Sequence, residues 1–184
     1  GGRELKLDIY SPEPEVASTR TAVVLVHGGG WLLGERNMVA PLANQFAANG
    51  FVAITVEYRL VREAAWPAQQ EDIVAAVEWT VANAERLGID PARVVVGGSS
   101  AGGHLALMAA AALAGSGKVA AVLSLFSASE LTLAQPAPKG MFGAPQLVGP
   151  TASAEQLRAA SPLHQVAAGF PPVFLLHGGA DWMI

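Results

Sequence analysis

The sequence predicts an α/β fold: a mostly parallel central sheet with helices on both faces, which makes a three-layer sandwich. Three observations support this prediction. Short, continuous apolar runs, typical of parallel strands covered on both faces, recur along the chain. Segments with apolar residues at helical spacing separate them, as in successive βαβ units. The composition, 52% hydrophobic and only 14% charged, indicates a large buried sheet with few solvated helix faces.

Six strands are expected. The first, Leu5–Tyr10, alternates apolar and polar residues and stops at Ser11-Pro12-Glu13-Pro14, so we expect a half-buried edge strand. The others are apolar runs, of which the first two are expected to be buried central strands and the last is expected to have an uncovered edge. They lie at residues 21–26, 51–56, 93–96, 119–126 and 173–176.

Helices are expected between these strands, at residues 37–49, 68–87 and 103–114. The first two are followed by Gly50 and Gly88, and glycine is the common residue after a helix end. Residues 127–171 are richer in Pro, Gly and Ser, with one short helical piece near 152–159. We expect this segment to be a small flap over the site, or an excursion without function.

Length and charge restrict the classes of protein. The 184 residues fit a single domain, 1–184. A net charge of −4 without a Lys/Arg cluster gives no electrostatic footprint for nucleic acid or an anionic membrane, so a small molecule is the expected partner. The absence of cysteine excludes disulfides, thiolate metal sites and a cysteine nucleophile. No apolar run is long enough to span a bilayer, so we expect a soluble protein, with its compartment undetermined.

Gly98-Ser99-Ser100-Ala101-Gly102 fits the pattern Gly-x-Ser-x-Gly, between an expected strand and an expected helix. In this turn the central serine sits on strained backbone, and the flanking positions must be small because a Cβ there would collide with the strand and helix. The pattern indicates Ser100, rather than Ser99, as a nucleophile. The following helix directs free N–H groups, that of Ala101 nearest, at negative charge above the turn. A glycine-rich connection with a capping serine would show the same pattern.

His27-Gly28-Gly29-Gly30-Trp31 decides between these interpretations. It follows the expected strand 21–26 directly. Three consecutive glycines let the backbone approach a ligand closely and turn N–H groups inward, which is how an oxyanion hole is built from main chain. The two motifs together, in this order in one parallel sheet, indicate a serine nucleophile beside an oxyanion hole.

The chain resembles the α/β-hydrolase fold, specifically esterases with His-Gly-Gly-Gly or His-Gly-Gly-x-Trp and Gly-x-Ser-Ala-Gly-Gly. These include the hormone-sensitive-lipase-like carboxylesterases, the acetyl-xylan and feruloyl esterase-like group and the kynurenine formamidase-like group. The similarity covers nearly the whole chain but is not specific to a substrate. Its landmarks are Leu7–Pro12, His27–Trp31, Tyr58–Leu60, Gly98–Ala106, Ser161-Pro162 and Pro171–Gly178.

The resemblance implies roles for individual residues. Ser100 would accept the acyl group, while the N–H groups of Gly29, Gly30 and Ala101 would hold the oxyanion. In this fold the acid and then the histidine follow the serine along the chain. Asp181, just beyond the strand 173–176, matches the position of the acid, although a polar turn residue could also stand there. Neither a cofactor nor a metal is expected.

The sequence departs from this pattern at the histidine, because none follows Asp181. We expect His27 to brace the glycine loop and His104 to pack beneath the site. His164 and His177 are the remaining substitutes for the base, without geometric support from the sequence.

We therefore expect the chain to be a fragment. A closing helix and strand, together with the catalytic histidine, would lie beyond Ile184, and the start at Gly1-Gly2 suggests a similar loss at the amino end. The leading hypothesis is a serine hydrolase that cleaves carboxylic esters of small molecules through an acyl-enzyme. The alternatives are a non-catalytic ligand-binding relative that lacks the base, and an arylformamidase or peptidase that uses the same serine.

Overall fold

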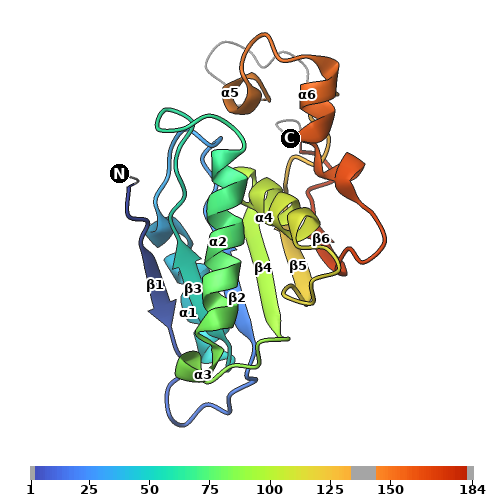
Figure 1. The fold of residues 1–184 in the computed structure, drawn as a ribbon. Helices are drawn as coiled ribbons and strands as arrows, with labels where there is room; N and C mark the ends of the chain where they lie inside the picture. Colours follow the sequence, from blue (N-terminus) through green and yellow to red (C-terminus); the bar gives the residue numbers. More distant parts are fainter. Residues whose placement is uncertain (1–2, 134–143, 182–184) are drawn as a thin grey trace.

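A computed structural model describes residues 3–133 and 144–181 and confirms the predicted α/β architecture (Figure 1). Its sheet has the strand order β1-β3-β2-β4-β5-β6. Strand β1 lies at an edge, as expected, and pairs antiparallel with β3, whereas the remaining pairs are parallel. The strands are β1 (Leu7–Tyr10), β2 (Ala22–Val26), β3 (Val52–Val56), β4 (Val94–Ser99), β5 (Ala121–Leu125) and β6 (Val173–Leu176).

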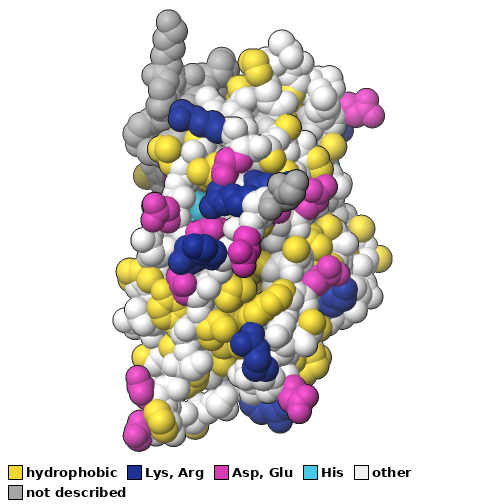
Figure 2. All heavy atoms as spheres, turned by 60° about the vertical axis from the view of Figure 1, so that its left-hand side comes forward, with side chains coloured by type: hydrophobic (Ala, Val, Ile, Leu, Met, Phe, Trp, Pro, Cys, Tyr) yellow, Lys and Arg dark blue, Asp and Glu magenta, His cyan; other side chains and the backbone are white. Residues whose placement is uncertain are grey.

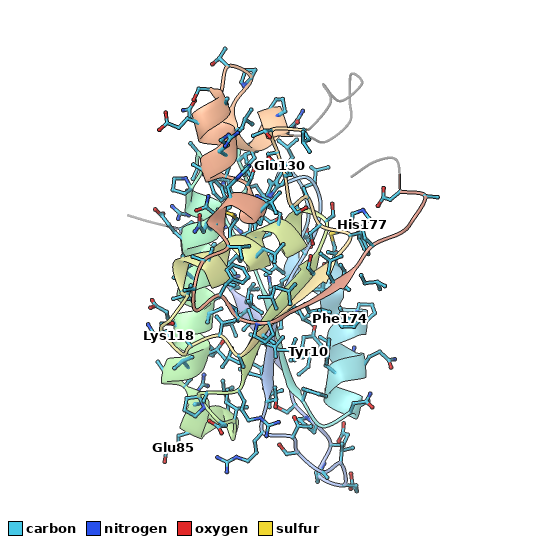
Figure 3. The ribbon with its side chains drawn as sticks, turned by 90° about the vertical axis from the view of Figure 1, so that its right-hand side faces the viewer. Tyr10, Glu85, Lys118, Glu130, Phe174 and His177 are labelled. Atoms are coloured by element: carbon cyan, nitrogen blue, oxygen red, sulfur yellow. The ribbon has the colours of Figure 1, made fainter. Side chains whose placement is uncertain are left out.

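Helices cover both faces of the sheet, so the three layers predicted from the sequence are present (Figures 1 and 3). Helices α2 (Ala68–Ala82) and α4 (Ala101–Ala112) lie on one face, and α1 (Ala40–Ala48) lies on the other. Shorter elements complete the described chain. They are η1 (Arg36–Val39), α3 (Ala84–Leu87), α5 (Ala144–Val148), α6 (Ala154–Ala159) and η2 (Pro162–Gln165).

The apolar runs of the sequence form the core. Every residue of β2 and β3 is buried, as expected of central strands with helices on both faces. Helix α4 is buried from Ala101 to Ala110, and its many small Gly and Ala residues let it pack closely against β4 and β5. The Gly-x-Ser-x-Gly motif therefore joins β4 and α4 at the centre of the molecule.

Several element boundaries differ from the sequence prediction. Strand β4 continues through Gly97–Ser99, and α4 begins at Ala101 rather than at residue 103, so the expected turn at 97–103 is reduced to Ser100. The helix expected at 68–87 breaks at Asn83 into α2 and α3. Helix α5 was not predicted. Residues 134–143 of the predicted flap at 127–171 lie outside the described residues.

The two edges of the described sheet differ in chemistry. On the side of β1, acidic and basic side chains are interspersed (Figure 2), and Arg36 pairs with Asp8 of β1 and with Glu57 after β3. Such charges discourage further strand pairing at an edge. At the other edge, β6 exposes apolar side chains on both faces, with Phe174 63% exposed (Figure 3). Among the described helices, none is long and apolar enough to cross a membrane.

Candidate active site

Ser100 forms a sharp turn between β4 and α4. Its backbone has φ 52° and ψ −123°, a conformation that L-residues rarely adopt, and it is the N-cap of α4. The turn is held from both sides: Ser100 N–H donates to the carbonyl of Leu125 at the end of β5 (2.9 Å), and its own carbonyl accepts from His104 N–H (3.0 Å). The strand-turn-helix geometry predicted for the motif is present, with Ser100 at its centre.

The glycines that flank Ser100 are required by close backbone contacts. A Cβ on Gly98 would lie 2.4 Å from the carbonyl oxygen of Val26, and one on Gly102 would lie 2.2 Å from the same oxygen. Real Cβ atoms do not approach backbone oxygen so closely, and the oxygen belongs to a central strand that cannot shift. Strand β2 and the start of α4 are therefore in direct contact, which places the segment after β2 beside Ser100.

The glycine loop that follows β2 lies against Ser100. A Cβ built on Gly28 would be 3.5 Å from Ser100 Cβ. Gly29 (φ 118°) and Gly30 (φ 60°) both have positive φ, and the Gly29 carbonyl accepts from Leu32 and Leu33 N–H within the loop. Among the described residues, none accepts a hydrogen bond from the N–H of Gly29 or Gly30. Both donors thus remain for a ligand.

His27 and Tyr58 make contacts at the start of this loop. The imidazole of His27 is buried, its Nδ1 lies 2.7 Å from the Gly28 carbonyl oxygen, and its ring stacks on that of Tyr58 at 4.4 Å between centroids. Tyr58 Oη donates to the His27 carbonyl (3.3 Å). Burial lowers the pKa of His27, so the ring stays neutral at neutral pH. His27 has the bracing contacts expected from the sequence.

Arg59, the other residue of the Tyr-Arg landmark, has a structural role. Its guanidinium bonds the buried Asp72 carboxylate of α2 through Nε (2.9 Å) and Nη2 (2.7 Å). The same carboxylate accepts Arg59 N–H (2.8 Å). This pair fixes the segment after β3 to α2, and with it the loop that leads to Trp66.

His104 lies one turn into α4 and is fully buried, as expected. Trp31 Nε1 donates to its Nδ1 (3.3 Å), and its Nε2 lies 2.8 Å from the Ala160 carbonyl oxygen. Because an indole N–H can only donate and a carbonyl can only accept, the imidazole proton sits on Nε2. The Trp66 ring also packs on it, with centroids 5.7 Å apart. No sequence pattern predicts these contacts, which join residues 56 and 73 positions apart.

Asp181 follows β6 at the same edge of the sheet as Ser100. Strands β4, β5 and β6 are parallel neighbours, so the ends of β4 and β6 lie about 10 Å apart. Asp181 N–H donates to the Gly178 carbonyl (3.1 Å), which closes a tight turn, and Asp181 Oδ2 lies 3.3 Å from His177 Nε2. The described structure therefore brings Ser100 and the glycine loop into contact and places Asp181 two strands away.

His164, the other candidate substitute, is engaged within the 127–171 segment. Its Nε2 lies 2.6 Å from Glu130 Oε2, and Glu130 Oε1 accepts from the Thr132 hydroxyl and shares the Ser161 hydroxyl hydrogen with the Leu157 carbonyl. Burial acts to raise the pKa of the Glu130 carboxyl, but the bonds from Thr132, the proximity of His164 and the Ser161 bond outweigh it and lower that pKa. Glu130, which contacts His164, lies after β5, whereas His177 lies after β6 (Figure 3). Within the described residues, no contact joins His164 or His177 to Ser100.

A cavity of about 360 Å³ lies between the loop after β3 and the short helices α5 and α6. It is of the size that binds small organic ligands. The described residues that line it are Val61, Ala65, Trp66, Gln146, Leu147, Val148, Gly149, Gln156 and Ala159. None of them carries a charge, so the cavity suits a neutral, largely apolar group. Among the described side chains, no cluster of His, Cys, Asp or Glu is arranged to hold a metal ion.

Comparisons with known proteins agree with this geometry. The chain is 30% identical to esterase LipQ of Mycobacterium tuberculosis over an alignment of 207 residues, which covers 100% of this chain and 48% of LipQ. It is 38% identical to carboxylesterase NlhH of the same organism over 111 residues, covering 60% of this chain and 34% of NlhH. The chain thus spans about half, or less, of the length of these relatives.

A solved structure matches the fold over nearly the whole chain. Esterase 2 of Thermogutta terrifontis, phosphorylated by paraoxon, superposes with a TM-score of 0.77 at 29% identity, covering 99% of this chain and 68% of the esterase. The fold is therefore that of the α/β-hydrolases, as the motifs predicted. A family model described as BD-FAE matches residues 7–184. The chain belongs to the BD-FAE family.

Proposed function

We propose that the protein is a serine hydrolase that cleaves carboxylic esters of small molecules through an acyl-enzyme. The hydroxyl of Ser100 attacks the ester carbonyl and gives its proton to a histidine base oriented by Asp181. The base returns that proton to the leaving alcohol as the tetrahedral intermediate collapses. Water then attacks the acyl-enzyme by the same route, which releases the carboxylic acid and restores the serine.

The observation that carries this proposal is the contact between the strained turn and the glycine loop. Ser100 is held at φ 52° with Gly28 packed against its Cβ position. The N–H groups of Gly29 and Gly30 are left for a ligand by the described residues, and Ala101 N–H lies at the start of α4. Three donors around one nucleophile fit the charge that develops on a carbonyl oxygen during acyl transfer.

The proposed substrates are esters of short, uncharged acyl groups. Structures of the Thermogutta terrifontis esterase 2 have butyrate or propionate bound, at 27% and 29% identity to this chain. The uncharged lining of the cavity beside α5 and α6 is consistent with such groups. Among the described residues of its wall, none carries a charge that could pair with a charged acyl chain.

An amide substrate is the second candidate. Arylacetamide deacetylase of Bos taurus is 34% identical over 108 residues, which cover 56% of this chain and 27% of that enzyme. The same serine and oxyanion donors could act on an amide, because both substrates pass through a tetrahedral oxyanion. A ligand-binding protein without turnover is the remaining alternative.

Turnover by matched variants tests the proposal. We expect the protein encoded by the complete reading frame to hydrolyse p-nitrophenyl butyrate, Ser100→Ala to lose at least about a thousandfold in kcat, and Ser99→Ala to retain most activity. Comparison of p-nitrophenyl butyrate with p-nitrobutyranilide separates ester from amide preference. Equal turnover by Ser100→Ala and the wild type would contradict the assignment, and no turnover by any of the three would favour the ligand-binding alternative.

A further inference from the structure

His104 contacts three segments that surround the candidate site. Trp31, which donates to its Nδ1, ends the glycine loop. Ala160, whose carbonyl faces its Nε2, directly follows Ala159 in the cavity wall, and Trp66 lines the same cavity. Figure 1 shows α4 at the centre, with α6 beyond the end of the sheet that carries the site. One buried side chain therefore touches the loop on one side and the cavity wall on the other.

We propose that His104 is a positioning residue that fixes the oxyanion loop and the wall of the acyl cavity in one arrangement about Ser100. The inference rests on the proposed esterase function. It assigns a separate contact to each ring nitrogen: Nδ1 positions the glycine loop through Trp31, and Nε2 positions the cavity wall through Ala160.

The attachment to the nucleophile is direct. His104 N–H donates to the Ser100 carbonyl (3.0 Å), so the ring is carried by the first turn of the helix that begins at Ser100. The described partners of the ring are uncharged, and a neutral imidazole is the natural group that presents one donor and one acceptor in opposite directions. Burial favours the neutral ring, which keeps this donor and acceptor pattern at neutral pH.

The Ala160 contact anchors a larger segment. Ala160 and Ser161 are fully buried. The Ser161 hydroxyl donates to the Leu157 carbonyl (2.7 Å) and accepts from Leu131 N–H (2.9 Å), which ties the start and the end of the described excursion together. A displacement at Ala160 would therefore move α6, and with it the cavity wall.

Two substitutions separate the contacts, because each amide can replace one ring nitrogen. In His104→Asn the side-chain oxygen can accept from Trp31, but the side chain is too short to reach Ala160. In His104→Gln the amide N–H can reach the Ala160 carbonyl, but the acceptor for Trp31 is lost. We expect His104→Asn to raise KM for p-nitrophenyl butyrate about tenfold with kcat within about twofold of wild type. We expect His104→Gln to lower kcat about tenfold or more with KM nearly unchanged.

Trp31→Phe provides an independent check from the other partner. It removes the indole N–H, so it should lower kcat as His104→Gln does. The double variant, Trp31→Phe with His104→Gln, should have a kcat no lower than that of the less active single variant. Trp79→Phe is the matched control, because Trp79 lies on α2 under Arg86 and outside these contacts. Equal effects of His104→Asn and His104→Gln on kcat and KM, or unchanged kinetics in both folded variants, would overturn the proposal.

Two measurements do not depend on activity. Imidazole ¹⁵N spectra should show His104 as the Nε2–H tautomer, and an Nδ1–H tautomer would overturn the assignment. Hydrogen exchange should accelerate at residues 154–165 in His104→Asn and at residues 28–33 in His104→Gln. If the wild type has no hydrolase activity, the proposed function fails, and the spectra and exchange decide whether His104 still joins the two segments.

Discussion

Acid should destabilise this protein through His104. Burial lowers the pKa of His104 from the ordinary 6.5 to about 4, and the Ala160 carbonyl opposes this only in part. The unfolded chain therefore binds a proton on this ring at a pH where the folded protein does not. Since the unfolded state binds more protons between the two pKa values, the free energy of unfolding falls as pH falls through that range.

The pKa difference sets the magnitude. One pKa unit corresponds to about 1.4 kcal/mol, so His104 alone should remove about 2 kcal/mol between about pH 7.5 and about pH 5, and about 3 kcal/mol by about pH 4. No discount for solvent screening applies, because the ring is fully buried. A loss of this size is a large part of the stability of an ordinary domain, which is about 5–15 kcal/mol.

Urea unfolding of the wild type and of His104→Gln, each at about pH 7.5 and about pH 5, isolates the contribution of His104 to the free energy of unfolding. The variant is expected to be less stable at neutral pH but to lose about 2 kcal/mol less on acidification, because its amide does not titrate. His27, whose pKa is also lowered by burial, adds a loss of the same sign that both proteins share. If the free energy of unfolding changed equally with pH in the two proteins, the pKa of His104 would not be lowered in the folded state, and this prediction would be wrong.

Three further predictions concern the oxyanion loop, the turn and the acid. Gly29→Val, at φ 118° and with its added Cβ 2.1 Å from a backbone oxygen, should lower kcat about a hundredfold or more in a protein that circular dichroism shows to be folded, whereas Gly88→Val, at φ 67° in open space, should leave kcat unchanged. Gly102→Ala, whose Cβ would lie 2.2 Å from the Val26 oxygen, should destabilise by about 1–3 kcal/mol in urea unfolding and lower kcat. Asp181→Asn should lower kcat about a thousandfold or more, and a loss below about tenfold would remove Asp181 from the acid role.

The turn at Ser100 could be predicted because its requirements are local. A strained serine between a strand and a helix needs small neighbours, and the sequence shows them directly. The end of β4 and the start of α4 could not be predicted, because the glycines at 97 and 98, taken alone, indicate a turn. In the structure they pair with Leu25 and Val26 of β2, and a Cβ on Gly97 would lie 2.6 Å from Leu123 Cβ. Tertiary packing, rather than turn formation, requires these glycines.

The roles of the histidines depend on contacts between distant segments. Helical spacing places His104 beneath the turn, but its partners belong to segments whose position no pattern encodes. Helix α5 and the cavity that it lines were missed for a related reason: the segment 127–171 lacks hydrophobic periodicity, so packing against the loop after β3 determines its shape. The expectation that the base lies beyond Ile184 stays a prediction.

Covalent labelling would identify the reactive serine. Esterase 2 of Thermogutta terrifontis is phosphorylated by paraoxon, so the protein encoded by the complete reading frame, treated with paraoxon and mapped by tandem mass spectrometry, should carry one phosphoryl adduct. The proposed role of Ser100 as nucleophile predicts the adduct on Ser100, with labelling abolished in Ser100→Ala and retained in Ser99→Ala. An adduct on Ser99, or undiminished labelling of Ser100→Ala, would contradict it.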